Sequence, residues 1–318
     1  MLDLLLLIVG LALLIKSADW LVVGGSDIAG RLGISPLVIG LTIISFGTSM
    51  PEMLVTVISG LQHRPDLAIA NVIGSNICNV LLVLGVAAIV RPLPVKDSTV
   101  VSEIPFSVTA ALLVGFLANA ALFTASDTLS ISRVDGLILL TFFVLFLLYV
   151  WKMSRDTNYF GDHEIRKLGT ARAVGYLALG IVGLYIGGDW VVDGAVGLAS
   201  RLGIDDALIG LTIVAIGTSS PELVASVVAA VKGETDIAVG NVVGSNIFNL
   251  LWILGFTATL IELPFEIVSN TDLIMVIGAS VMIIVALVTS RRGAILRSHG
   301  ILFVLLYLAY LGHVVTRA

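Results

Sequence analysis

Long apolar blocks separated by short polar breaks dominate the chain. Leu4–Ile15, Leu137–Trp151 and Leu273–Val288 run almost without interruption, and lipid is the solvent that such blocks match. Apolar segments of about 20 residues predict ten membrane helices. The expected spans are 3–23, 37–61, 66–90, 103–122, 133–152, 171–195, 207–231, 236–259, 272–290 and 295–315. The fold class is therefore expected to be an all-α integral membrane protein.

An internal repeat organises these segments. Asp19-Trp20 recurs as Asp189-Trp190, Arg31-Leu32-Gly33-Ile34 as Arg201-Leu202-Gly203-Ile204, Gly47-Thr48-Ser49-Met50-Pro51-Glu52 as Gly217-Thr218-Ser219-Ser220-Pro221-Glu222, and Gly74-Ser75-Asn76-Ile77-Cys78-Asn79 as Gly244-Ser245-Asn246-Ile247-Phe248-Asn249. Each pair is 170 positions apart, as in 222 minus 52. A match at one offset through helices and loops alike indicates a duplication.

The number of helices in each copy predicts how the copies are related. Five helices are an odd number, so the second copy must enter the membrane from the opposite side. We therefore expect two inverted five-helix repeats, with a binding site at their interface near the membrane midplane. Residues 1–152 form the first half, 153–170 a short central loop and 171–318 the second half.

Composition narrows the function classes. Hydrophobic residues make up 58% of the chain and charged residues 12%, about half the charged fraction of a soluble protein. A net charge of −5 gives no basic surface for nucleic acid. The single cysteine excludes a disulfide or a thiolate metal cluster, and the four histidines are scattered. We expect no cofactor and no obligate protein partner beyond the lipid bilayer.

The cationic residues predict the orientation. Loops on one side hold twelve lysines and arginines, namely Arg31, Arg91, Lys96, Lys152, Arg155, Arg166, Lys167, Arg172, Lys232, Arg291, Arg292 and Arg297, whereas the other side holds Arg64, Arg133, Arg201 and Arg317. Cytoplasmic loops carry the excess of positive charge. A multi-pass protein of the cell (inner) membrane is expected, with both termini outside and the central loop cytoplasmic.

Two glutamates lie well inside apolar segments. Glu52 falls within the second expected span and Glu222 within the seventh. A charge at membrane depth costs about 2.5–3.5 kcal/mol on insertion scales, so such residues face a polar interior and usually mark an ion path. Helical spacing places three further positions on the face of each glutamate. These are Ser45, Thr48 and Ser49 beside Glu52, and Ala215, Thr218 and Ser219 beside Glu222.

A proline precedes each glutamate. Pro51 and Pro221 have no N–H, and their rings disturb the carbonyls four residues earlier, at Gly47 and Gly217. These runs are expected to unwind locally and turn carbonyl oxygens toward a cavity, because irregular backbone at membrane depth is tolerated only there.

The third and eighth spans supply an opposing wall. Asn71, Ser75 and Asn79 share one helical face, as do Asn241, Ser245 and Asn249. The combined site offers two carboxylates, hydroxyls, amide oxygens and backbone carbonyls. Calcium takes about 6–8 oxygen ligands in flexible geometry, so this set favours calcium, with sodium as a competitor. Helix packing or a simple kink explains each feature singly, but the combination occurs twice at one offset.

These paired motifs resemble the two alpha-repeats of the sodium/calcium exchanger family, within the calcium/cation antiporter superfamily, and the length resembles prokaryotic members. The resemblance implies ten helices with cation sites around helices 2, 3, 7 and 8, and alternating access by sliding of helices 1 and 6. It makes Glu52 and Glu222 the central calcium and sodium ligands. The further oxygens come from Thr48, Ser49, Thr218, Ser219, Ser75, Ser245 and Asn79, with backbone carbonyls from Ser45 and Ala215.

One position departs from the family pattern. Archaeal exchangers of this type resemble this chain but carry an aspartate where it has Asn249. The departure argues against potassium cotransport and weakens a proton-coupled mechanism. The expected function is exchange of calcium for sodium, with a calcium (or other cation)/proton antiporter as the alternative. A channel would need a continuous ligand ring, and an enzyme a nucleophile with a base, so neither is expected.

Overall fold

A computed structural model describes residues 2–95, 102–123, 129–154, 168–202, 215–267, 269–290 and 293–317. The first half contains α1 (Leu2–Leu32), α2 (Pro36–Ile39), the π-helical segment η1 (Gly40–Ile44), α3 (Ser45–Thr48), α4 (Met50–Leu61), α5 (Pro65–Cys78), the π-helical segment η2 (Asn79–Leu84), α6 (Gly85–Val90), β1 (Leu93–Pro94), α8 (Glu103–Ala118), the 3-10 turn η3 (Ala120–Phe123), β2 (Ser130–Ile131) and α9 (Arg133–Ser154).

The second half repeats this order. It contains α10 (Thr170–Arg201), α12 (Ala215–Thr218), α13 (Ser220–Lys232), α14 (Thr235–Ile247), the π-helical segment η6 (Phe248–Ile253), α15 (Leu254–Leu260), β3 (Leu263–Pro264), α16 (Ser269–Thr289), β4 (Ala294–Ile295) and α17 (Arg297–Arg317). The all-α fold expected from the apolar blocks is confirmed.

The spans agree with the sequence, although the count of ten stays a prediction. Seven helices of the described chain are long and apolar enough to cross a membrane, and α2 through α4 form a further span bent by 48°. The apolar helix α8 is shorter. The expected span 207–231 is described only from Ala215 onward, as α12 and α13, and most of the expected loop 153–170 lies outside the described residues.

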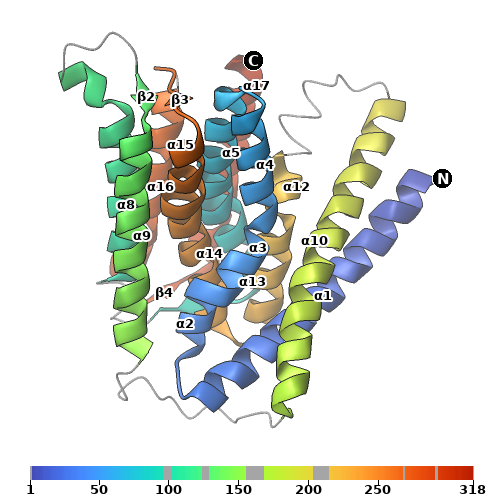
Figure 1. The fold of residues 1–318 in the computed structure, drawn as a ribbon. Coiled ribbons are helices and arrows are strands. Elements are labelled where there is room, and N and C mark those ends of the chain that lie inside the picture. The colour runs from blue at the N-terminus through green and yellow to red at the C-terminus, as the bar shows by residue number, and fades with distance from the viewer. Residues whose placement is uncertain are drawn as a thin grey trace.

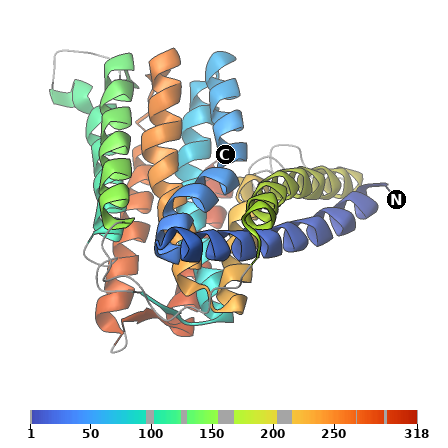
Figure 2. The ribbon, with the colours of Figure 1, turned by 60° about the horizontal axis from the view of Figure 1, so that its bottom comes forward.

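The first helix of each half forms a separate layer. Helices α1 and α10 pack along each other and lean away from the remaining helices (Figures 1 and 2). Glycines allow this close approach: a Cβ on Gly10 would lie 2.9 Å from the Val191 nitrogen, and one on Gly180 2.8 Å from the Leu21 nitrogen. Gly10 and Gly180 are equivalent residues, so both copies use the same contact.

Both helices of this pair are longer than expected. The predicted ends at residues 23 and 195 are wrong, because α1 continues to Leu32 and α10 to Arg201. The glycines near those ends serve close packing and do not end the helices. A Cβ on Gly24 would lie 2.8 Å from the Ala173 carbonyl oxygen, closer than real side chains approach.

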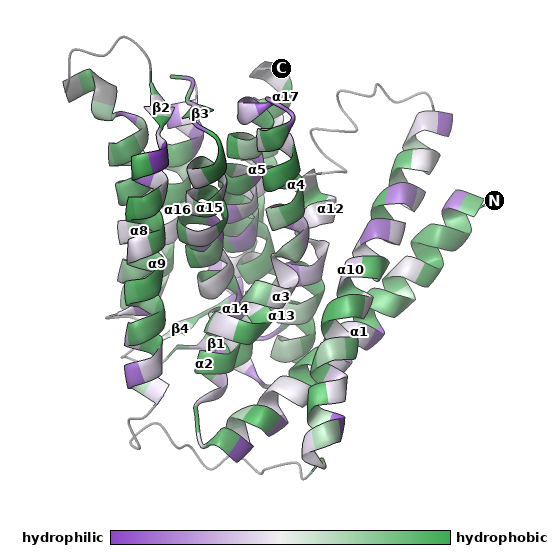
Figure 3. Cartoon of the chain, in the orientation of Figure 1, coloured by the Kyte–Doolittle hydropathy of each residue, from purple (hydrophilic) through white to green (hydrophobic). Residues whose placement is uncertain are grey.

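The third helix of each half forms the centre of the remaining bundle. The continuous spans Pro65–Val90 and Thr235–Leu260 are 78% and 94% buried over their most apolar windows, against 28% for α9 and 17% for α17. The exposed side chains of α9 are largely apolar, as Figure 3 shows along its length. The outer helices therefore meet lipid, and the central helices carry the protein core.

Two short sheets tie the halves together. Strand β1 pairs antiparallel with β4, and β2 pairs with β3. Each sheet thus joins a strand of the first half to one of the second. The two repeats are interlocked at both ends of the bundle.

Candidate cation site between the two repeats

Both glutamate-bearing helices are broken at the expected place. The first break falls at Ser49, which has φ −85° and ψ 10°, and the second at Ser219, with φ −85° and ψ 7°. Helices α4 and α13 each restart on the next residue with a proline in the first turn. Pro51 has no N–H for the carbonyl of Gly47, so the chain turns there. The predicted local unwinding is confirmed in both copies.

The carboxylates and serines at the breaks are bonded crosswise between the repeats. Ser49 donates its hydroxyl to Glu222 Oε1 at 2.9 Å, and Ser219 donates to Glu52 Oε1 at 3.2 Å. Ser75 adds a weaker hydrogen bond to Glu52 Oε1 at 3.5 Å. Each glutamate therefore accepts a hydrogen bond from the other repeat and lies at the repeat interface, where inverted repeats usually place their binding site.

The second oxygen of each carboxylate is free of protein partners. Glu52 and Glu222 are both fully buried, and in each the Oε2 atom accepts no hydrogen bond from the described residues. None of the ion pairs among those residues includes either glutamate. Two buried carboxylates without cationic partners call for a bound cation or a proton, because an unpaired charge in this environment is costly.

Two asparagines fix the backbone of the glutamates. Asn71 donates its amide to the Glu52 carbonyl at 3.1 Å and to the Thr56 hydroxyl at 2.9 Å. Asn241 makes the equivalent bonds to the Glu222 carbonyl at 3.4 Å and to the Ser226 hydroxyl at 3.0 Å.

Sequence reasoning placed both asparagines on the opposing wall but missed this positioning role. It also missed Thr56 and Ser226 as their partners. The available signal was that a hydroxyl recurs at positions 56 and 226, again 170 apart.

The amides of Asn79 and Asn249 are buried and have no hydrogen-bond partner among the described residues, and the Ser245 hydroxyl is likewise unpartnered. Asn79 begins η2 and Asn249 lies in η6. Segment η2 packs against α13, and η6 packs against α4, so each faces the glutamate helix of the other repeat. Wide π-helical turns are frequent at functional sites, since they redirect side chains out of the regular helical register.

The remaining expected residues are placed in different ways. Thr48 bonds to the Ser45 carbonyl at 3.4 Å and to Asn241 Oδ1 at 3.1 Å, so its hydroxyl lies at the repeat interface. The Ser45 carbonyl also accepts the Ser49 N–H at 3.0 Å, so a cation would share this oxygen with two donors. Ala215 begins α12, and its side-chain surroundings lie outside the described residues.

The donor set suits a hard cation. Carboxylate, hydroxyl and amide oxygens surround the crossing point, and the described residues include no group of three or more His, Cys, Asp or Glu that could hold a metal. Softer metals prefer imidazole and thiolate, while oxygen-rich sites with few charges suit calcium and sodium.

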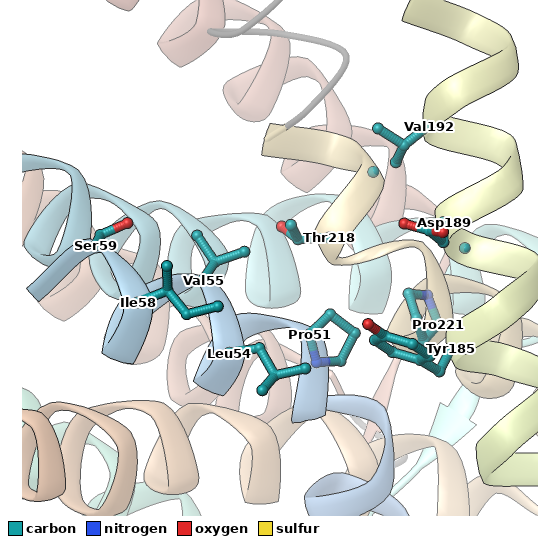
Figure 4. Close-up of a pocket in the computed structure, with 12 residues that line it drawn as sticks. Pro51, Leu54, Val55, Ile58, Ser59, Tyr185, Asp189, Val192, Thr218 and Pro221 are labelled. Atoms are coloured by element: carbon teal, nitrogen blue, oxygen red, sulfur yellow. The ribbon is translucent and has the colours of Figure 1, made fainter. Parts of the chain in front are cut away.

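A cavity of about 400 Å³ lies beside the two broken helices. It lies between α4, α10 and the second broken helix, as Figure 4 shows. Its lining residues are Pro51, Leu54, Val55, Ile58 and Ser59 from α4, Tyr185, Gly188, Asp189 and Val192 from α10, and Gly217, Thr218 and Pro221. Pro51 and Pro221 directly precede the two glutamates. The cavity therefore borders both broken helices next to the two buried glutamates.

This combination defines a membrane transporter built from inverted repeats, and comparison with known proteins gives the family. The sodium/calcium exchanger protein family matches residues 2–152 and 172–316. The chain belongs to this family, which comprises transporters rather than enzymes.

Individual relatives agree. The sodium/calcium exchanger MaX1 of Methanosarcina acetivorans is 32% identical over 344 aligned residues, covering 96% of this chain and 97% of that protein. The inner membrane protein YrbG of Escherichia coli is 40% identical over 262 residues, covering 80% and 78%. The structure of the sodium-calcium exchanger NCX_Mj soaked with Na⁺ and Ca²⁺ superposes with a TM-score of 0.82 at 32% identity, covering 98% of both chains.

Proposed function

We propose that this protein is a secondary active antiporter that exchanges calcium for sodium by alternating access. The observation that carries the proposal is the pair of crosswise carboxylates. Glu52 and Glu222 each have one oxygen held by a serine of the other repeat and one oxygen without a hydrogen-bond partner among the described residues. Two negative charges balance either one calcium or two sodium ions, so the two cations exclude each other from the site.

The proposed ligands extend beyond the glutamates. Thr48, Ser49, Ser75 and Asn79 from the first repeat and Thr218, Ser219, Ser245 and Asn249 from the second supply neutral oxygens, with carbonyls from Ser45 and Ala215. All of these groups except the half-buried Thr218 and Ala215, whose side chain lies outside the described residues, are buried, which supports the assignment. Neutral donors matter because calcium needs about 6–8 oxygens and the carboxylates provide four at most.

The α1–α10 layer is the proposed moving part. Within this layer, α1 and α10 pack against each other through glycines. The layer contacts the rest of the protein beside the cavity. Movement of this layer across the two broken helices would close the cavity on one side and open the site to the other. The fixed site and the moving layer then correspond to alternating access around the repeat interface.

The proposed membrane is the cell (inner) membrane, as for the relative named an inner membrane protein. The excess of lysine and arginine on one side supports an orientation with the central loop in the cytoplasm and both termini outside. In this orientation the cavity beside Ser59 opens to the outside, because α4 runs outward from the midplane.

A cation/proton antiporter is the second candidate. The same two carboxylates, lacking a basic partner among the described residues, can also be neutralised by protons. The absence of a third carboxylate at Asn249 favours sodium over this alternative.

Radioactive calcium uptake into proteoliposomes separates the candidates. Vesicles loaded with sodium, potassium or choline are compared, with and without an imposed pH gradient. We expect calcium uptake only into the vesicles that are loaded with sodium. Uptake driven by the pH gradient in choline-loaded vesicles would move the protein to the proton-coupled class.

A further inference from the structure

The duplication places an acidic residue in each of two equivalent passages. Asp189 lines the open cavity between α10 and α4. Its equivalent, 170 positions earlier, is Asp19 on α1. At the same offset, α4 is equivalent to α13 and α10 is equivalent to α1. The region equivalent to the cavity therefore lies between α1 and α13. We call this second region the closed passage.

In the closed passage, the described helices pack directly against each other. Helix α1 packs against α13, and the equivalents of cavity-lining residues are buried between them. Ala225 is 1% exposed, whereas its equivalent Val55 on the cavity wall is partly exposed. One passage is therefore open while its counterpart is sealed, as alternating access requires.

An ion pair joins the two walls of the closed passage. Lys232 Nζ lies 2.5 Å from Asp19 Oδ1, and the two side chains are 26% and 35% exposed. Lys232 is in the last turn of α13, directly before the left-handed Gly233. The carbonyl end of a helix favours a cation, so the lysine is stabilised there in addition to its pairing.

The open cavity lacks this ion pair. The residue equivalent to Lys232 is Gln62, which follows α4 and carries no charge. No described residue forms a salt bridge with Asp189. The two halves thus share the aspartate but not the lysine, and the lysine is found only on the sealed side.

We propose that the Asp19–Lys232 pair is a one-sided gate that holds the closed passage shut. Opening this passage moves α1 away from α13 and separates the pair, whereas opening the other passage breaks no equivalent contact. The gate biases the protein toward the conformation with the cavity beside α4. Once released from Lys232, Asp19 keeps its contact with Lys16 on the same helix and faces the opened passage, in the position that Asp189 has now. The gate rests on the alternating access proposed above.

Cysteine accessibility tests the gate without requiring transport. Reporter cysteines replace Val55 in the open cavity and, separately, its equivalent Ala225 in the closed passage. A membrane-impermeant maleimide is applied, and peptide mass spectrometry locates the label, so the buried native Cys78 is followed independently. While Lys232 is present, we expect the reporter cysteine at position 55 to react and the one at position 225 to be protected.

The test variant is Lys232→Gln, which makes position 232 match Gln62. We expect labelling of the Ala225 reporter to rise several-fold and labelling of the Val55 reporter to fall. The matched control is Lys16→Gln, because Lys16 also contacts Asp19, at 3.4 Å, but lies on α1 itself and does not join α1 to α13. Its labelling rates should stay unchanged.

A second variant guards against misfolding. Gln62→Lys adds a lysine opposite Asp189, and it should lower labelling of the Val55 reporter by favouring closure on that side. Unchanged rates in both Lys232→Gln and Gln62→Lys would overturn the gate. If the labelling shifts as expected but the protein does not exchange calcium for sodium, the gate is supported and the proposed calcium/sodium exchange is refuted.

Discussion

Replacement of Glu52 by glutamine tests whether the buried carboxylates hold a cation. The change keeps side-chain size and retains an oxygen that can accept from Ser219 and Ser75. It removes one of the two negative charges at the crossing point and replaces one carboxylate oxygen by an amide nitrogen, which cannot ligate a cation. The hydrogen-bonded frame should therefore persist while the electrostatic attraction for calcium is halved.

The size of the effect follows from burial. Glu52 is 0% exposed, so solvent screens its charge little. Removing one member of a buried charged pair costs about 3–5 kcal/mol, which corresponds to about 10²–10⁴-fold in the dissociation constant for calcium. A ligand at 100 times its dissociation constant stabilises the folded state by about 2.7 kcal/mol. At that same calcium concentration, the Glu52→Gln variant should gain almost nothing.

The assay is thermal unfolding of detergent-solubilised protein across a calcium titration. Glu103→Gln is the matched control, since Glu103 is also 0% exposed in a membrane helix and its Oε2 also lacks a partner among the described residues, but its Oε1 is held within its own repeat by Tyr149 at 2.7 Å and Ser102 at 2.8 Å. The control should keep the full calcium-dependent rise in melting temperature. Full stabilisation of Glu52→Gln by calcium, or an equal loss in Glu103→Gln, would refute the reasoning.

Three further predictions concern packing, backbone and ion selectivity. Gly180→Ala should lower the free energy of unfolding by about 1–3 kcal/mol, because its Cβ would lie 2.8 Å from the backbone of α1; Gly175→Ala on the same helix meets nothing within 4 Å and should be neutral or stabilising. His63 has φ 56° where its equivalent Gly233 has φ 85°, so His63→Gly should raise stability by about 1 kcal/mol and Gly233→Ala should lower it by a similar amount; denaturation measurements check both pairs. Asn249→Asp should make calcium transport fall more steeply as pH decreases, because a third carboxylate offers protons another place to compete with cations; an unchanged pH profile would contradict this.

The repeat made much of the site predictable. A constant offset of 170 identified equivalent residues, and proline chemistry predicted where both helices break. The spacing of Ser49 and Glu52 predicted that they share one helical face, and both side chains bond to the other repeat. It did not reveal that Ser49 bonds to Glu222, because that contact depends on how the inverted halves meet.

The π-helical segments and the helix ends could not be predicted from the pattern of apolar and polar residues. Segments η2 and η6 are apolar runs whose wide turns arise from tertiary packing rather than from residue type. The glycines at 24 and 25 read as a break, yet α1 continues through them because they pack close to neighbouring helices. Intrinsic preference is a weak guide where packing between helices decides the outcome.

The most direct test of the central claim is equilibrium binding of radioactive calcium to the purified protein across a sodium titration. If Glu52 and Glu222 form one shared site, sodium should displace calcium completely, and the Glu52→Gln/Glu222→Gln double variant should bind no calcium. Calcium binding that does not decrease as sodium is added, or that persists in the double variant, would contradict a shared site between the repeats.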